Sequence, residues 1–303
     1  MNGRPFTPEE LEKRGHGGTP MNGRQLITEA RNTWCPGCGN FSIQFALKAL
    51  FQDLEKQGTS LDDVVLVTGI GCHAKLADYL HINSFYSIHG RVLPVATAIK
   101  LANPDLTVIG CAGDGDAYAE GLDHLIFAAK RNVDITLFIH NNRVYGLTTG
   151  QYTPTSPLGF KGRSTPFGTL EYPLNPLELM YASGASFIAR GYTRNQLHLK
   201  KTMTDAVRHK GFSFVDILQI CATYFDVHDV YDKYVYELTD HDPHDPAQAM
   251  RRILEWDYNN PAPIALGTFF EREIPTFEGR FPKQPSVPAD RKEKIRKLLD
   301  SYR

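Results

Sequence analysis

Two short motifs that are rich in oxygen ligands stand at the ends of two apolar runs of the chain. GDGD at 113–116 follows the run LTVIGCA, and NN at 141–142 overlaps the end of the run ITLFIHN. Asp114 and Asn142 are 28 positions apart, about the length of one strand, one helix and one further strand. Because a βαβ unit returns the chain beside its first strand, both residues are expected to reach one crevice.

The chemistry of such a crevice suits a metal-bound diphosphate. A carboxylate, an amide oxygen and a backbone carbonyl are hard ligands for Mg²⁺, which completes its shell with phosphate oxygens and water. Gly113 and Gly115 allow a close approach of the backbone to phosphates, and the helix that follows presents its N-terminus to them. GDGD or NN taken alone is more simply interpreted as a turn. Both together, each at the end of a buried strand, favour a functional site.

Four of the five cysteines stand beside the ends of expected elements. Cys35 and Cys38 form a CxxC directly before an expected helix, and Cys72 and Cys221 each follow an expected strand. All four can converge on one edge of a sheet, and four thiolates form the ligand set of a [4Fe-4S] cluster. Cys111 lies inside the run TVIGCAG, and we interpret it as a small core residue.

Two other interpretations of the cysteines compete with the cluster. Structural zinc is one, although a zinc ribbon normally has a second close CxxC, whereas Cys72 and Cys221 are widely separated. A thioredoxin-like redox motif is the other, although its CxxC follows a hydrophobic strand and the residues EARNT before this one are polar. A brown protein that dithionite bleaches would support the cluster, and a colourless zinc protein would contradict it.

The elements that must position these residues are predicted from apolar periodicity. Short apolar runs typical of strands buried on both faces of a parallel sheet occur at 64–70, 106–112, 135–141, 185–190 and 212–218. Helical patterns occur at 41–54, 92–102, 118–130, 176–183 and 194–209. This alternation predicts an α/β fold, a parallel sheet flanked by helices with its ligands at the carboxyl ends of the strands.

Composition sets limits on partners and compartment. The chain has 303 residues and a formal charge of -1, so it lacks the basic surplus of a nucleic-acid-binding protein. No apolar run approaches the roughly 18 residues that span a bilayer, and no secretory signal is evident, so no membrane partner is expected. Five cysteines in a long chain without an evident secretory signal indicate a reducing compartment, and we expect a cytoplasmic location.

Three regions are expected along the chain. Residues 1–33 form an N-terminal arm, residues 34–224 the α/β domain with its cofactor and cysteine sites, and residues 225–303 a C-terminal extension. The extension is polar and aromatic, contains several prolines, and ends in the helix-like DRKEKIRKLLDSYR. We expect it to pack on the domain or on a partner subunit.

The motifs together resemble those of a known family. GDG followed by NN is similar to the thiamine diphosphate motif, and the chain also carries WCPGCG, GIGCHAK and HGRVLPVATAIKLANP. This combination resembles the β subunits of 2-oxoacid:ferredoxin oxidoreductases over roughly residues 33–225. The resemblance extends through LTTGQYTPTSPLGFK at 147–161, which in the family helps to enclose the diphosphate. Departures are Ala117, where a glycine is common, and CATY at 221–224 in place of a CPTF-like sequence.

The resemblance implies a fold, cofactors and site residues. The fold is that of the diphosphate-binding module, and Asp114 and Asn142 hold Mg²⁺ by side chain while Val144 does so by its backbone carbonyl. The four cysteines outside the core run hold the cluster. The cofactor-binding residues that the motifs imply are Gly113, Asp114, Gly115, Asp116, Asn142, Val144, Gly146, Leu147 and Thr148.

The implied reaction converts 2-oxoglutarate, coenzyme A and oxidised ferredoxin to succinyl-CoA, CO₂ and reduced ferredoxin, or runs in reverse. Lys75, three positions after Cys72, is the implied partner of the substrate carboxylate, and its presence favours 2-oxoglutarate over pyruvate. On sequence alone a solvated lysine at a helix start is the simpler interpretation. A pyruvate-specific or broad-specificity 2-oxoacid enzyme is the alternative within the family.

The resemblance also implies partners. One GDG to NN unit fills the α/β region, so an α subunit is expected to supply the pyrimidine-binding module and its activating glutamate in an (αβ)₂ heterotetramer. Ferredoxin is the expected electron acceptor. An alternative of another class is a non-catalytic Fe-S electron-transfer module, against which the intact Asp114 and Asn142 argue. An acetolactate-synthase-like lyase would leave the four cysteines unexplained.

Overall fold

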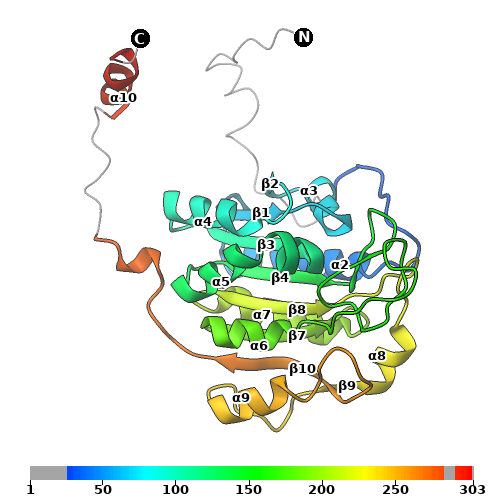
Figure 1. Cartoon of the computed structure of the whole chain (residues 1–303). Coiled ribbons are helices and arrows are strands. Elements are labelled where there is room, and N and C mark those ends of the chain that lie inside the picture. The colour runs from blue at the N-terminus through cyan, green and yellow to red at the C-terminus, as the bar shows by residue number, and fades with distance from the viewer. Residues whose placement is uncertain (1–25, 283–290, 302–303) are drawn as a thin grey trace.

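The computed structural model describes residues 26–282 and 291–301, which contain an eight-stranded sheet of order β2-β1-β3-β4-β8-β7-β10-β9 (Figure 1). A two-stranded hairpin, β5-β6, stands apart from it. The strand bounds are β1 Val64–Thr68, β2 Asn83–Tyr86, β3 Thr107–Gly113, β4 Thr136–Asn141, β5 Val144–Tyr145, β6 Gln151–Tyr152, β7 Phe187–Tyr192, β8 Ser213–Leu218, β9 Val235–Glu237 and β10 Ile264–Glu271.

The five predicted strands are confirmed as β1, β3, β4, β7 and β8, and all neighbouring pairs among them are parallel. Sequence periodicity did not predict three further strands of this sheet. β2 pairs with β1 although all four of its residues are exposed, so no apolar run marks it. β9 and β10 both belong to the C-terminal extension. β10 pairs antiparallel to β7, and β9 pairs with β10.

Helices cover both faces of the sheet (Figure 1). The predicted helix at 118–130 divides into a π-helical turn, η4 at Asp116–Glu120, and α5. The bounds of the α-helices are α2 Asn40–Lys56, α3 Leu76–Tyr79, α4 Val92–Ala102, α5 Leu122–Arg131, α6 Pro176–Ser183, α7 Gln196–Arg208, α8 His228–Tyr234, α9 Pro246–Ile253 and α10 Arg291–Asp300.

The two faces of the sheet carry separate apolar cores. On one face α4, α5, α6 and α9 bury residues such as Leu125 and Met180 against the strands. On the other face α2, α3 and α7 do so with residues such as Leu47 and Met203. Burying a side chain of this size contributes about 1.5–3 kcal/mol, so two such layers hold the strands in fixed register. The loops at the strand ends are therefore presented by a rigid frame.

Four neighbouring strands end at the same edge of the sheet. In the register of the strands, Thr68 of β1 is paired with Cys111 of β3, and Gly113 at the end of β3 is paired with His140 of β4. Asn141 at the end of β4 faces Leu218 of β8. The loops that follow these strands begin at Gly69, Asp114, Asn142 and Gln219, so the topology places the predicted motifs side by side.

The first described residues pack on this frame. Most of the predicted N-terminal arm, residues 1–25, lies outside the described residues, but Leu26 is buried and Ile27 forms a bridge with Leu80. The predicted C-terminal helix is confirmed as α10, which lies away from the sheet (Figure 1). Within the described ranges, none of the helices has the length and apolar character needed to cross a membrane.

Candidate functional site

A cavity opens at the carboxyl edge of β1, β3 and β4. Its walls come from the loops after these strands and from the β5-β6 hairpin. All nine predicted cofactor-binding residues line it. The cavity is lined by Ile70, Gly71, Cys72, His73, His89, Gly113, Asp114, Gly115, Asp116, His140, Asn142, Val144, Tyr145, Gly146, Leu147, Thr148 and Gln219.

Asp114 is a deeply buried carboxylate in this cavity, with 2% of its surface exposed. The hydroxyls of Thr153 and Thr155 both donate to Oδ2, at 2.5 and 2.9 Å. Burial raises the pKa of Asp114 to about 6, although these two hydrogen bonds lower it. A cation beside the carboxylate would offset the desolvation of the charged form, so the site fits a metal ion.

Asn142 and Val144 line the same cavity from the loop that joins β4 to β5. The Asn142 side-chain oxygen accepts a hydrogen bond from the Val144 amide at 3.1 Å, which fixes a tight turn. Arg143 between them adopts a positive φ of 61°. Its guanidinium is buried and donates to the Thr155 carbonyl at 2.7 Å, so the turn is tied to the segment that holds Asp114. A strained backbone held in this way is typical of a pre-organised site.

Gly113 and Gly115 keep the floor of the cavity open. The Gly113 amide donates to His73 Nε2 at 3.2 Å. A Cβ atom at Gly115 would lie 2.3 Å from the Tyr145 ring, so only glycine fits beneath it. Asp116 accepts the Gly90 amide at 2.7 Å through Oδ1, and its buried Oδ2 has no hydrogen-bond partner among the described residues.

The four cysteines outside the strands line a second cavity of about 240 Å³, which adjoins the first. Trp34 Nε1 donates to the Cys72 carbonyl at 2.7 Å, so the segment before the CxxC is held to the loop after β1. The Gly39 amide donates to the Ile220 carbonyl at 3.0 Å, so the CxxC is also held beside Cys221. Cys111 lies in β3, fully buried and away from this cavity, as predicted for a core residue.

The cysteine sulfurs influence one another electrostatically. Burial raises the pKa of Cys72 to about 12, and the charges of Cys38, Cys221 and Cys35 contribute to the same shift. Burial also raises the pKa of the Cys38 thiol. Four thiolates in one half-buried cavity repel one another unless positive charge lies between them, and this donor set fits a cationic iron-sulfur core.

No group of three or more His, Cys, Asp or Glu side chains is arranged to hold a single metal ion in the described part of the chain. The cysteines border a cavity instead of meeting at one point. In a [4Fe-4S] cluster each thiolate binds a different iron, so the cluster fills the space between the sulfurs.

The two cavities share a wall made of Cys72, Asn142, Gly146, Leu147 and Gln219. Gly146 lies at their junction. A Cβ atom there would lie 3.5 Å from the Cys72 sulfur, 3.7 Å from the Asn142 side-chain nitrogen and 3.8 Å from the Cys221 sulfur. The predicted metal ligand and two predicted cluster ligands therefore face one another across a single glycine.

Lys75 lines the cysteine cavity and not the cavity of Asp114. Its ammonium forms an ion pair with Asp78 at 2.5 Å. The hydrogen bond to Asp78 raises the pKa of Lys75, so the ammonium stays charged at neutral pH. The lysine is therefore a cation close to the shared wall, and the ion pair with Asp78 fixes its position.

Among the polar residues of the site, Thr153 and Thr155 were predicted only as part of the segment 147–161, and Gln219 was not predicted. Thr153 and Thr155 lie within YTPTS, whose closely spaced hydroxyls were the available signal. Gln219 follows an apolar strand as a single amide, which no motif marks.

A buried polar cluster holds Asn141, the residue that precedes the turn around Asn142. Asn141 donates to Asp216 Oδ1 at 2.9 Å and accepts from Thr155 at 2.9 Å. Tyr258 donates to the other Asp216 oxygen at 2.6 Å, and burial raises the pKa of Asp216 while Arg190 lowers it. Tyr258 belongs to the C-terminal extension, so this region contributes to the frame of the site.

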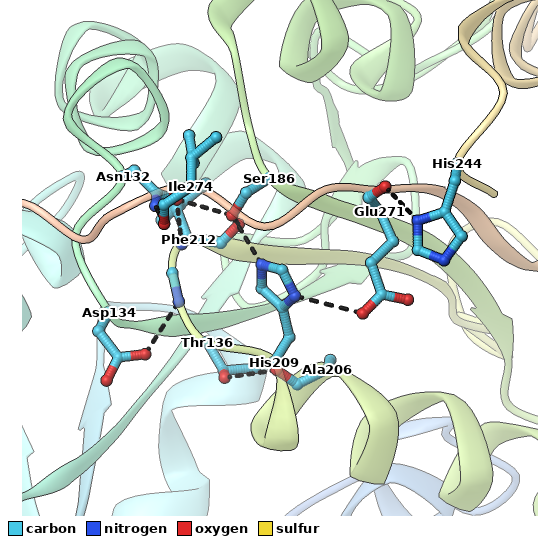
Figure 2. Close-up of polar contacts among 11 residues, drawn as sticks. Asn132, Asp134, Thr136, Ser186, Ala206, His209, Phe212, His244, Glu271 and Ile274 are labelled. Atoms are coloured by element: carbon cyan, nitrogen blue, oxygen red, sulfur yellow. Dashed lines mark hydrogen bonds and ion pairs between the residues drawn. The ribbon is translucent and has the colours of Figure 1, made fainter.

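A second polar cluster, at the opposite end of β7 and β8, has a structural role (Figure 2). Ser186 Oγ lies 2.8 Å from His209 Nε2, and His209 Nδ1 lies 3.4 Å from Glu271. The sequence of groups is that of a hydrolase triad, but Ser186 is fully buried and also donates to Asn132 at 2.6 Å. The buried hydroxyl is out of reach of a substrate, so the cluster is not a catalytic triad. Its role is structural, since the contact of His209 with Glu271 fastens the end of β10 to the sheet.

Comparisons with known proteins agree with this geometry. The family model of the thiamine pyrophosphate enzyme C-terminal TPP binding domain matches residues 69–217. A model of the C-terminal part of the pyruvate ferredoxin oxidoreductase β chain matches residues 221–285. The β subunit of the 2-oxoacid:ferredoxin oxidoreductase of Saccharolobus solfataricus is 41% identical over 266 residues, which cover 82% of this chain and 85% of the relative.

The chain belongs to the 2-oxoacid:ferredoxin oxidoreductase β subunits. The 2-oxoglutarate oxidoreductase subunit KorB of Mycobacterium tuberculosis is 39% identical to this β subunit over 207 residues, 68% of this chain and 55% of the relative. A solved 2-oxoglutarate:ferredoxin oxidoreductase of Magnetococcus marinus, with 2-oxoglutarate, coenzyme A and succinyl-CoA bound, has a TM-score of 0.80 at 30% identity. That match covers 94% of this chain and 93% of the other.

The predicted family and fold are thereby confirmed. The β subunit is part of a thiamine-diphosphate-dependent oxidoreductase, and its family name implies an α subunit.

Proposed function

We propose that this β subunit, with its α subunit, oxidises 2-oxoglutarate and coenzyme A to succinyl-CoA and CO₂ and reduces ferredoxin. The observation that carries the proposal is the shared wall between the cofactor cavity and the cysteine cavity. The names of the KorB relatives and of the Magnetococcus marinus enzyme support 2-oxoglutarate as the substrate.

The first cavity would hold thiamine diphosphate and Mg²⁺. Asp114, Asn142 and the Val144 carbonyl would bind the metal, with Gly113, Gly115 and Asp116 around the diphosphate. Gly146, Leu147 and Thr148 would close over it from the β5-β6 hairpin. When bound, thiamine diphosphate supplies the electron sink that decarboxylation of a 2-oxoacid requires.

The second cavity would hold one [4Fe-4S] cluster on Cys35, Cys38, Cys72 and Cys221. Cys35 and Cys38 precede α2, Cys72 follows β1, and Cys221 follows β8. The cluster would therefore cross-link the loops after β1 and β8 to the start of α2. The Trp34 and Gly39 hydrogen bonds hold the segments that carry these cysteines beside one another.

The residues of this chain perform four tasks in the proposed reaction. Asp114 and the turn around Asn142 anchor the diphosphate, and Lys75 attracts the distal carboxylate of the substrate. The apolar cores behind the strands exclude water from the floor of the site. Keeping the two cavities one glycine apart provides a short path for electrons.

The proposed assembly is an (αβ)₂ heterotetramer in the cytoplasm with ferredoxin as acceptor. The proposed cluster site on four of the five cysteines supports a reducing compartment. For the domains we propose the division predicted from sequence, an arm at 1–33, the α/β domain at 34–224 and the extension at 225–303. The boundary between the two family matches, near residue 220, supports the second division.

The isolated β subunit is expected to show no 2-oxoacid oxidation, because the carboxylates that line its cofactor cavity, within the described residues, are those of Asp114 and Asp116. A glutamate that activates the aminopyrimidine must then come from the α subunit. The measurement is viologen reduction with a panel of 2-oxoacids, for each subunit alone and for the mixture. Activity only in the mixture, with 2-oxoglutarate preferred, supports the proposal, whereas full activity of the β subunit alone contradicts it.

Replacing Lys75 with methionine is expected to lower the ratio of kcat/KM for 2-oxoglutarate to that for pyruvate by about 10- to 100-fold, since a charge-assisted hydrogen bond contributes about 1.5–3 kcal/mol. Pyruvate has no distal carboxylate and should be little affected. Lys56→Met is the matched control, because the Lys56 side chain is 76% exposed and lies on the surface of α2. An unchanged ratio in Lys75→Met would remove this residue from substrate selection.

A further inference from the structure

Gln219 occupies the shared wall between the two cavities. It is the first residue after β8, and its backbone amide donates to the Asn141 carbonyl at 3.0 Å. The residue is 2% exposed, and it lines both the cofactor cavity and the cysteine cavity. A buried amide in this position must be explained by the groups it contacts.

One end of the Gln219 amide contacts a cysteine sulfur. Nε2 lies 3.6 Å from the Cys38 sulfur, within the range of a hydrogen bond to sulfur. A thiolate bound to iron can only accept hydrogen bonds, so the nitrogen end of the amide has to face it. The oxygen end, Oε1, is buried and has no hydrogen-bond partner among the described residues.

Gly39 allows the Gln219 side chain to pack closely against the CxxC segment. A Cβ atom on Gly39 would lie 2.7 Å from Gln219 Cγ and 2.9 Å from the Ile220 amide nitrogen. Glycine directly after Cys38 therefore allows the amide to reach the sulfur. The same contact fixes the CxxC segment against the residue that follows β8.

We propose that Gln219 raises the reduction potential of the iron-sulfur cluster by donating a hydrogen bond to the Cys38 thiolate, from a position where it also borders the cofactor cavity. The inference rests on the proposed cluster. Reduction adds negative charge to the cluster and its sulfurs, and a donor to one of those sulfurs stabilises the reduced form more than the oxidised form. Gln219 thus acts through Cys38 as a positioning residue and does not transfer electrons itself.

The test is a redox titration of the anaerobically purified αβ complex, followed by electron paramagnetic resonance, for the wild type and Gln219→Met. Methionine keeps the length of the side chain and removes the donor. We expect the midpoint potential to shift to a more negative value, with four irons per β subunit retained. An unchanged potential overturns the inference.

Gln44→Met is the matched control, because Gln44 is also buried, lies on α2 next to the CxxC, and donates to the Tyr79 carbonyl instead of a sulfur. Its midpoint potential should equal that of the wild type, and a shift as large as that of Gln219→Met would overturn the assignment to the sulfur contact. If the wild-type complex contains no iron-sulfur cluster, it is the proposed function that fails.

A second measurement decides the case if Gln219→Met does not retain its cluster. The wild-type complex is labelled with ¹⁵N at its glutamine side-chain amides and reduced, and the coupling of ¹⁵N to the cluster is measured by pulsed electron paramagnetic resonance. A ¹⁵N coupling supports the hydrogen bond from Gln219. Its absence in a complex with a full cluster overturns the inference.

Discussion

Replacing Asp114 with asparagine is expected to reduce turnover of the αβ complex by at least about 100-fold. Loss of a group that only orients a metal ligand already lowers metal affinity or activity by about 10- to 100-fold. Asparagine keeps the shape of the side chain and can still accept from Thr153 and Thr155. It removes the negative charge that Mg²⁺ requires. Thiamine diphosphate affinity, measured by calorimetry in the presence of Mg²⁺, should fall in parallel with activity.

Asp123→Asn provides the control for this substitution. Asp123 lies in the first turn of α5, close in sequence to GDGD, and its side chain is 72% exposed. Its activity and cofactor affinity should match the wild type. Wild-type affinity for thiamine diphosphate in Asp114→Asn would mean that this carboxylate is not a metal ligand.

Replacing Cys72 with serine is expected to abolish ferredoxin reduction and to leave less than a full cluster in the complex. A serine oxygen is a hard ligand and a poor substitute for the soft thiolate that iron-sulfur clusters require. The charges of the three other cysteines contribute to the raised pKa of Cys72, which lines one cavity with them. Iron and acid-labile sulfide should be measured per β subunit, with ferredoxin-linked activity.

The control for this second substitution is Cys111→Ala. Cys111 is fully buried in β3, and burial raises the pKa of its thiol, so it is an inert core group. This variant should keep a full cluster and full activity, with a loss of stability of about 1 kcal/mol for a small core truncation. A full cluster in Cys72→Ser, or loss of the cluster in Cys111→Ala, would require a different set of ligands.

Much of the frame is predictable from sequence because its central strands are buried on both faces. Runs such as VVLVT and TLFIHN are mainly apolar, and every residue of the second is buried, as is typical of a central strand of a parallel sheet. The GDGD and NN motifs are predictable as a pair because β3 and β4 are adjacent and parallel, so their ends meet at one edge. The four cysteines line one cavity for the same reason, since each stands beside the end of a central strand or the start of α2.

The contacts that the sequence could not indicate are those between loops. Thr155 reaches Asp114 from 41 positions away, and Gln219 reaches Cys38 from 181 positions away, each across tertiary structure that no local pattern encodes. The ion pair of Lys75 with Asp78 depends on which of several polar neighbours its flexible side chain selects. β10 was missed because its residues follow a proline-containing polar segment and pair with β7, far away in sequence.

The central claim is that cofactor and cluster occupy adjoining cavities of this β subunit, close enough for direct electron transfer. The most direct test mixes the anaerobic αβ complex with 2-oxoglutarate and coenzyme A, without ferredoxin, and records electron paramagnetic resonance spectra after freeze-quenching. Oxidation of one 2-oxoglutarate releases two electrons and one [4Fe-4S] cluster accepts one of them, so the account predicts the signal of a reduced cluster before the first turnover is complete. A cluster that dithionite reduces but that stays oxidised after substrate addition, in a complex with full thiamine diphosphate content, would contradict it.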